Sequence, residues 1–145
     1  MNRWSESAQR VAERSITLVR DTHGLLPLRT DNVATVVVSP HGDPIEIALP
    51  QHDVESADVL LLLLALRPKS GAGAITVPEE IVRLATQHSH KTIAVAFGSP
   101  YILRELGDAS TFVCAWGVQP VLQDAALRAI RGEFAMTGQL PVTIG

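Results

Sequence analysis

Hydrophobic positions along the chain alternate between helical spacing and short apolar runs. Within residues 5–19, apolar side chains recur every three or four positions, which predicts an amphipathic helix that Gly24 ends. Further helices are expected from Pro78, between residues 99 and 107, and over residues 120–132. Apolar and β-branched runs predict strands at residues 33–38, 45–49, 58–66, 92–97, 111–116 and 140–144.

The order of these elements indicates an α/β fold. Helices alternate with strands whose residues are almost all apolar, which is typical of a mostly parallel sheet buried on both faces. We therefore expect a three-layer sandwich, with five to six strands flanked by helices in a flavodoxin-like arrangement. The 145 residues suffice for one domain, which we expect to span residues 1–145.

Composition and charge exclude several classes of partner. The formal net charge is −3 and aromatic residues make up 4% of the chain, so no nucleic-acid partner is expected. The apolar run at residues 59–66 is shorter than the roughly 20 residues that cross a bilayer, so no membrane partner is expected either. The first residues contain no apolar stretch typical of a signal peptide, which leaves the cytoplasm as the default location.

Candidate catalytic and metal-binding patterns are weak. Cys114 is the only cysteine and lies in an apolar run, which favours a buried small side chain over a nucleophile. His88 and His90 have no evident third ligand, so we expect them to lie at a solvated helix end. Glu79 and Glu80 are adjacent, so their side chains diverge on a helix. We expect no catalytic residue, no metal and no cofactor in this chain.

Three segments carry a family resemblance. The first is residues 12–20 followed by Gly-Leu-Leu-Pro-Leu at residues 24–28, and the second joins Ala57-Asp58 to a strand that continues to Gly-Ser-Pro-Tyr at residues 98–101. The third is Gly132-Glu133 followed by Gly-Gln-Leu-Pro-Val-Thr-Ile at residues 138–144. In this order they span nearly the whole chain, which resembles the C-terminal domain of family 3 glycoside hydrolases.

This resemblance implies that the chemistry lies elsewhere. In that family a preceding (β/α)-barrel carries the aspartate nucleophile, and the present chain is too short for a barrel of about 250 residues. β-Glucosidase-like members keep an acid/base glutamate in the second domain, but the matching residues 67–77 include no Asp or Glu. β-N-Acetylglucosaminidase-like members keep their histidine–aspartate pair in the barrel, and the chain resembles that branch better. It departs from the family at residues 41–57, which are shorter than the usual crossover.

Two functional hypotheses follow, and a third has no residues to support it. The first is an accessory domain that packs against a catalytic barrel, with carbohydrate at the domain interface and Arg67, Lys69 and Tyr101 as substrate-facing candidates. The alternative is a free-standing module that binds a small molecule or a protein on a flavodoxin-like sheet. An independent hydrolase would need a convergent acid–base pair, which the sequence does not suggest.

Overall fold

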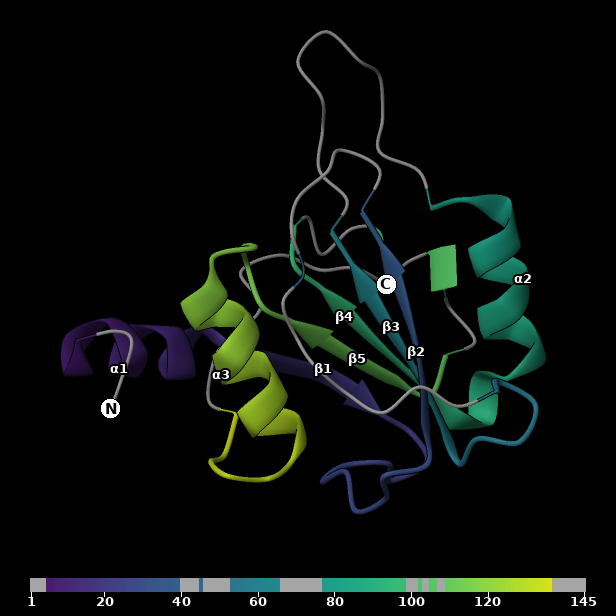
Figure 1. Ribbon diagram of the computed structural model, residues 1–145, viewed down its shortest axis with the longest axis horizontal. Coiled ribbons are helices and arrows are strands. Elements are labelled where there is room, and N and C mark those ends of the chain that lie inside the picture. Colours follow the sequence, from purple (N-terminus) through teal and green to yellow (C-terminus); the bar gives the residue numbers. More distant parts are fainter. Residues whose placement is uncertain are drawn as a thin grey trace, which may run out of the picture.

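A five-stranded sheet forms the centre of the protein, seen here in a computed structural model that describes residues 5–39, 45, 53–65, 77–98, 102, 105–106 and 109–136 (Figure 1). The strands lie in the order β1-β5-β4-β3-β2. Their bounds are β1 Thr17–Asp21, β2 Val33–Val38, β3 Val59–Leu64, β4 Thr92–Ala96 and β5 Thr111–Cys114. Strands β2 to β5 are parallel to one another, whereas β1 runs antiparallel to β5.

The central strand β3 shows why the sheet is buried on both faces. All six of its residues are buried, and their side chains alternate between two apolar cores. Leu60, Leu62 and Leu64 belong to one core, and Leu61 and Leu63 belong to the other. Burying each of these leucines stabilises the fold by roughly 1.5–3 kcal/mol. This gain explains why the apolar run at residues 59–64 lies at the centre of the sheet.

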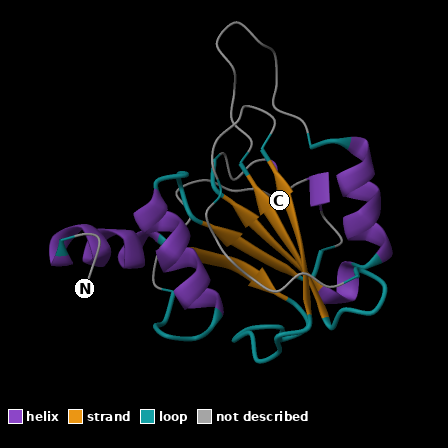
Figure 2. Cartoon of the chain, viewed as in Figure 1, coloured by secondary structure: helices purple, strands orange, loops and turns teal. Residues whose placement is uncertain are grey.

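Helices cover both faces of this sheet (Figure 2). On one face, α2 (Glu79–Gln87) packs Ala85 and its apolar neighbours into the first core. On the other face, α3 (Pro120–Ile130) and α1 (Glu6–Ser15) pack into the second core. A short 3₁₀ helix, η1 (Ser89–Lys91), joins α2 to β4. The predicted three-layer α/β sandwich with a mostly parallel sheet is confirmed.

The first predicted helix is too long. Helix α1 ends at Ser15, Ile16 has extended backbone angles (φ −63°, ψ 124°), and residues 17–21 form β1 instead of continuing the helix to Val19. Thr17 and Val19 are β-branched and favour a strand. The physical cause is tertiary. Without β1, strand β5 would be an edge strand with unpaired backbone groups, and residues 17–21 pair with it, as Thr17 does with Cys114.

Gly24 was predicted to end a helix, and this was wrong because it follows a strand. It has a positive φ of 66° in the turn that leaves β1. The Asp21 carboxylate holds this turn, since it accepts hydrogen bonds from the backbone N–H groups of Leu25 (2.9 Å) and Leu26 (3.1 Å). The apolar anchor that follows packs against the second core and donates from Leu28 N–H to the Ile130 carbonyl at 2.7 Å.

Three predicted elements fall largely outside the described residues. These are the strand at 45–49, of which only Ile45 is described, the helix at 99–107 and the strand at 140–144. Among the helices that the structure does describe, none has the length and apolarity to cross a bilayer.

Candidate functional site

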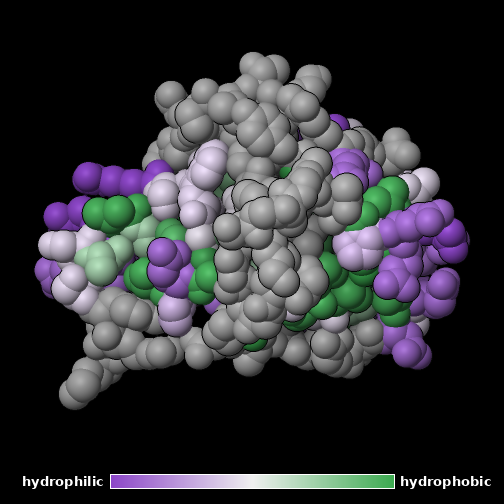
Figure 3. Space-filling view, turned by 90° about the horizontal axis from the view of Figure 1, so that it is seen from above, coloured by the Kyte–Doolittle hydropathy of each residue, from purple (hydrophilic) through white to green (hydrophobic). Residues whose placement is uncertain are grey.

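The carboxyl ends of the parallel strands form the edge at which open α/β sheets bind ligands. Hydrogen bonds between the strands continue past their ends here, from Ala65 N–H to Val38, from Phe97 N–H to Leu64 and from Ala115 N–H to Ala96. Figure 3 looks onto the molecule from above, where hydrophilic residues gather at both outer ends and hydrophobic residues lie inward of them. We call the end of the sheet formed by the last residues of β2, β3, β4 and β5 the carboxyl edge.

The turn from β5 into α3 is the best-defined part of the carboxyl edge. Trp116 has a positive φ of 67°, which is unusual for a residue other than glycine, and its indole Nε1–H donates to Thr17 Oγ1 at 3.1 Å. A Cβ atom on Gly117 would stand 2.2 Å from Gln119 Oε1 and 2.9 Å from Leu122 Cδ1, so a larger residue here would displace these two side chains. The buried Gln123 donates from Nε2 to the Val118 carbonyl at 2.7 Å and fixes the start of α3.

Glu105 fixes another part of this edge. Both of its carboxylate oxygens accept a hydrogen bond from the Val77 backbone N–H, at 3.2 and 3.3 Å. This contact ties Val77, two residues before α2, to the segment between β4 and β5. The carboxylate therefore has a structural partner in this backbone N–H group.

Arg67, Lys69 and Tyr101, the predicted substrate-facing residues, lie outside the described residues. They follow β3 and β4 in the sequence, so the chain leaves the described sheet towards all three positions at the carboxyl edge. Their role in contacting a substrate stays a prediction. Trp116 and Glu105 were missed at the sequence level, because neither lies in a recognisable motif.

Cys114 is the last residue of β5 and is 1% exposed. Burial raises the pKa of its thiol from 9.0 to about 12, which strongly disfavours the thiolate. The prediction that Cys114 acts as a buried small side chain is confirmed, and the thiol is a poor nucleophile at neutral pH.

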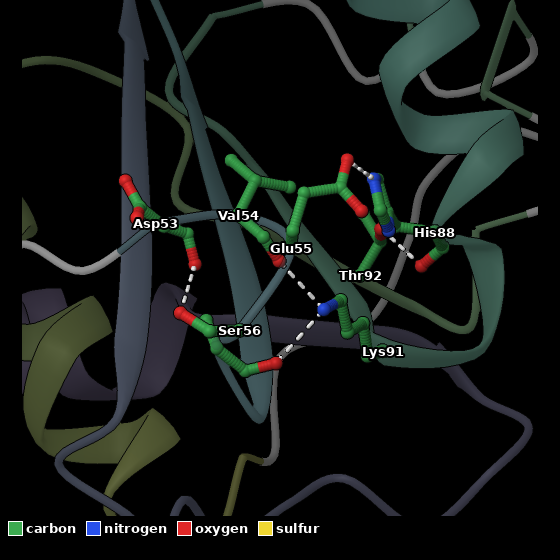
Figure 4. A network of polar contacts seen from close by, with 8 residues as sticks. Asp53, Val54, Glu55, Ser56, His88, Lys91 and Thr92 are labelled. Carbon is green, nitrogen blue, oxygen red and sulfur yellow. Dashed lines mark hydrogen bonds and ion pairs between the residues drawn. The ribbon is translucent and has the colours of Figure 1, made fainter.

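A second polar cluster lies at the opposite, amino end of the parallel strands (Figure 4). Lys91 is 9% exposed, and its Nζ donates to the carbonyls of Val54 (2.7 Å) and Ala57 (2.8 Å), just before β3. Thr92 Oγ1, at the start of β4, donates to the His88 carbonyl at 2.7 Å. The ammonium group thus closes the turn at residues 53–57, which is a structural role.

His88 belongs to the same cluster, and its predicted solvation was wrong. The residue is 9% exposed because the turn at residues 53–57 packs over it, and its Nε2 lies 3.7 Å from Glu55 Oε1 (Figure 4). His90, by contrast, is exposed as predicted. Within the described residues, no group of three His, Cys, Asp or Glu side chains could hold a metal ion.

The chain is similar in sequence to a larger glycosidase. It is 26% identical to a β-N-acetylglucosaminidase/β-glucosidase from Cellulomonas fimi, in an alignment that covers 95% of this chain and 32% of that protein. No family model matches the chain. It therefore spans about a third of the length of this curated relative.

Solved structures show the same fold. A fungal multi-domain family 3 β-N-acetylglucosaminidase superposes with a TM-score of 0.71 at 16% identity, covering 94% of this chain and 18% of that one. A β-glucoside phosphorylase gives 0.69 at 18% identity, with 94% and 31% coverage. The family 3 β-N-acetylglucosaminidase of Paenibacillus sp. str. FPU-7 gives 0.68 at 16% identity, with 94% and 32% coverage. The predicted resemblance to one domain of family 3 glycoside hydrolases is confirmed, in sequence by the Cellulomonas fimi enzyme and in fold by these structures.

Proposed function

We propose that residues 1–145 form the accessory C-terminal domain of a family 3 glycoside hydrolase of the β-N-acetylglucosaminidase type, and that a separate barrel domain performs the hydrolysis. The observation that carries this proposal is the asymmetry of the matches. They cover about 95% of this chain but a third or less of each protein that it resembles. The remaining two thirds is ample length for a catalytic barrel.

The geometry of the carboxyl edge supports an accessory role. Cys114 is buried with a raised pKa, Glu105 is bound to a backbone N–H group, and the Trp116 indole is bound to Thr17. Hydrolysis of a glycosidic bond needs an acid/base group and a nucleophile or activated water placed on the two sides of the bond. The polar groups of Glu105 and Trp116 are instead used in hydrogen bonds that hold this edge together.

The position at which the chain enters the sheet also supports this role. Helix α1 leads into β1, and Thr17 at the start of β1 pairs with Cys114 at the carboxyl end of β5. A domain that precedes α1 would therefore be joined to the carboxyl edge through α1, a helix about 15 Å long. At the carboxyl edge, polar groups from Arg67, Lys69 and Tyr101 would then form part of one wall of a carbohydrate site between the two domains.

The size of the protein in its native source tests this proposal. An antibody raised against the purified chain should detect a polypeptide about three times as long, since the chain covers 32% of its curated relative. The same polypeptide, captured by the antibody, should hydrolyse a chromogenic N-acetylglucosaminide. Detection of the free chain alone, at 15.6 kDa and without this activity in the captured fraction, would contradict the proposal.

A further inference from the structure

Helix α1 extends sideways beyond α3 and the sheet (Figure 1). Of its residues only Ala12 is buried, and Val11 is 68% exposed. A ten-residue helix with so little buried surface would be expected to swing about its junction with β1 unless specific contacts hold it. Two groups of polar contacts hold α1 in place, at two different points along the helix.

The first contact joins α1 to α3. Arg128 of α3 donates from Nη1 to Glu13 Oε2 of α1 at 2.9 Å and from Nε to Asp124 Oδ2 at 2.8 Å. Burial alone would lower the pKa of Arg128, but hydrogen bonds with Asp124 and Glu13 raise it above its usual value, so the guanidinium stays charged. Because one planar guanidinium binds both carboxylates, the distance between the two helices is fixed at this point.

The second contact fixes the end of α1. The Trp116 indole donates to Thr17 Oγ1, and the Thr17 hydroxyl in turn donates to the Ser15 carbonyl at 2.9 Å. Ser15 is the last residue of α1, and Trp116 lies at the carboxyl edge. One hydroxyl group therefore links the last carbonyl of the helix to the turn that carries the unusual backbone of Trp116.

We infer that α1 is a rigid connector, and that Arg128 and Thr17 are positioning residues that hold α1 in one orientation relative to the carboxyl edge. This inference rests on the proposed function, in which a catalytic domain precedes α1. A fixed connector would place that domain against the wall built by the carboxyl edge without relying on the interface alone. Pre-organisation of this kind lowers the entropy lost when two domains dock.

Distances between spin labels on the purified chain test the connector. Labels on Ser7→Cys of α1 and Gln87→Cys of α2 report the orientation of α1, and both positions are exposed. Cys114 is buried with a pKa of about 12 and will not take the label under mild conditions. A reference pair, Arg29→Cys with Gln87→Cys, reports the body of the domain.

Wild-type α1 should give a single narrow distance distribution. Combining Thr17→Val with Arg128→Met should widen it at least twofold, while the reference pair stays unchanged, because valine keeps the shape of the buried Thr17. Thr17→Ser combined with Arg128→Lys keeps a hydroxyl and a cation and should restore most of the narrow distribution. A broad wild-type distribution, or a narrow one that survives Thr17→Val with Arg128→Met, would overturn the inference. Neither result depends on glycosidase activity, so the proposed function is tested separately.

Discussion

Gly132 lies directly against Pro27, and a Cβ atom added to Gly132 would stand 2.7 Å from the Cβ of Pro27. Gly132 has a φ of 85° and ends α3 with two backbone hydrogen bonds, from its own N–H to Ala129 and from Glu133 N–H to Arg128. This is the Schellman arrangement, in which glycine is favoured. The first and third segments of the family resemblance thus contact each other across the end of α3.

The contact predicts a large effect of Gly132→Ala on stability. The substitution adds both a left-handed backbone strain and a clash with the rigid Pro27 ring, so we expect the free energy of unfolding to fall by about 2–4 kcal/mol. Gly24→Ala is the matched control, since Gly24 has a similar φ of 66° but nothing within 4 Å of the added atom. It should cost about 1 kcal/mol in the same urea titration. Equal losses for the two variants would refute the role of Pro27.

Lys91→Met should destabilise the protein through the turn that precedes β3. The variant leaves the carbonyls of Val54 and Ala57 without their ammonium donor, at an expected cost of about 1–3 kcal/mol in free energy of unfolding. Arg83→Met is the control, because Arg83 makes an exposed ion pair with Glu79 on α2 and should change stability by less than about 0.5 kcal/mol. If chemical denaturation gives the two variants the same free energy of unfolding, the hydrogen bonds from Lys91 to Val54 and Ala57 do not stabilise the protein.

Cys114 should make the protein less stable at high pH. The folded thiol has a pKa of about 12 and an unperturbed thiol one of 9.0, so above pH 9 the unfolded chain releases a proton that the folded chain retains. The stabilising contribution is fully present below pH 9 and is lost as the pH rises towards 12, by up to about 1.4 kcal/mol per pH unit.

The Cys114→Ala variant isolates this effect, because other groups that titrate at high pH are common to both proteins. Between pH 8 and pH 10.5, the stability advantage of the wild type over Cys114→Ala should shrink by about 2 kcal/mol. An advantage that stays constant over this range, measured by urea unfolding at each pH, would show that the thiol is solvated.

The hydrophobic pattern predicted the sheet well where local and tertiary preferences agree. In β3 every residue is apolar, and any register buries both faces, so the strand could be placed from sequence alone. Residues 17–21 could not, because their helical spacing continued that of α1 and only the open edge of β5 made them a strand. Sequence spacing carries no information about such a neighbour.

The polar contacts were harder to predict than the strands. Lys91 and His88 stand in a polar run that suggests a solvated surface, and they are buried only because the turn at residues 53–57 packs over them. Trp116 binds Thr17 across 99 residues of sequence. By contrast, the lack of a carboxylate in residues 67–77 was evident from the sequence and pointed to a non-catalytic domain.

A chromogenic N-acetylglucosaminide assay on the purified 145-residue chain addresses the accessory role most directly. We expect release of the chromophore at the rate of buffer alone, because the described carboxyl edge offers no acid–base pair and its only cysteine is buried and protonated. Turnover well above that rate, co-eluting with the chain through two purification steps, would contradict a purely accessory domain.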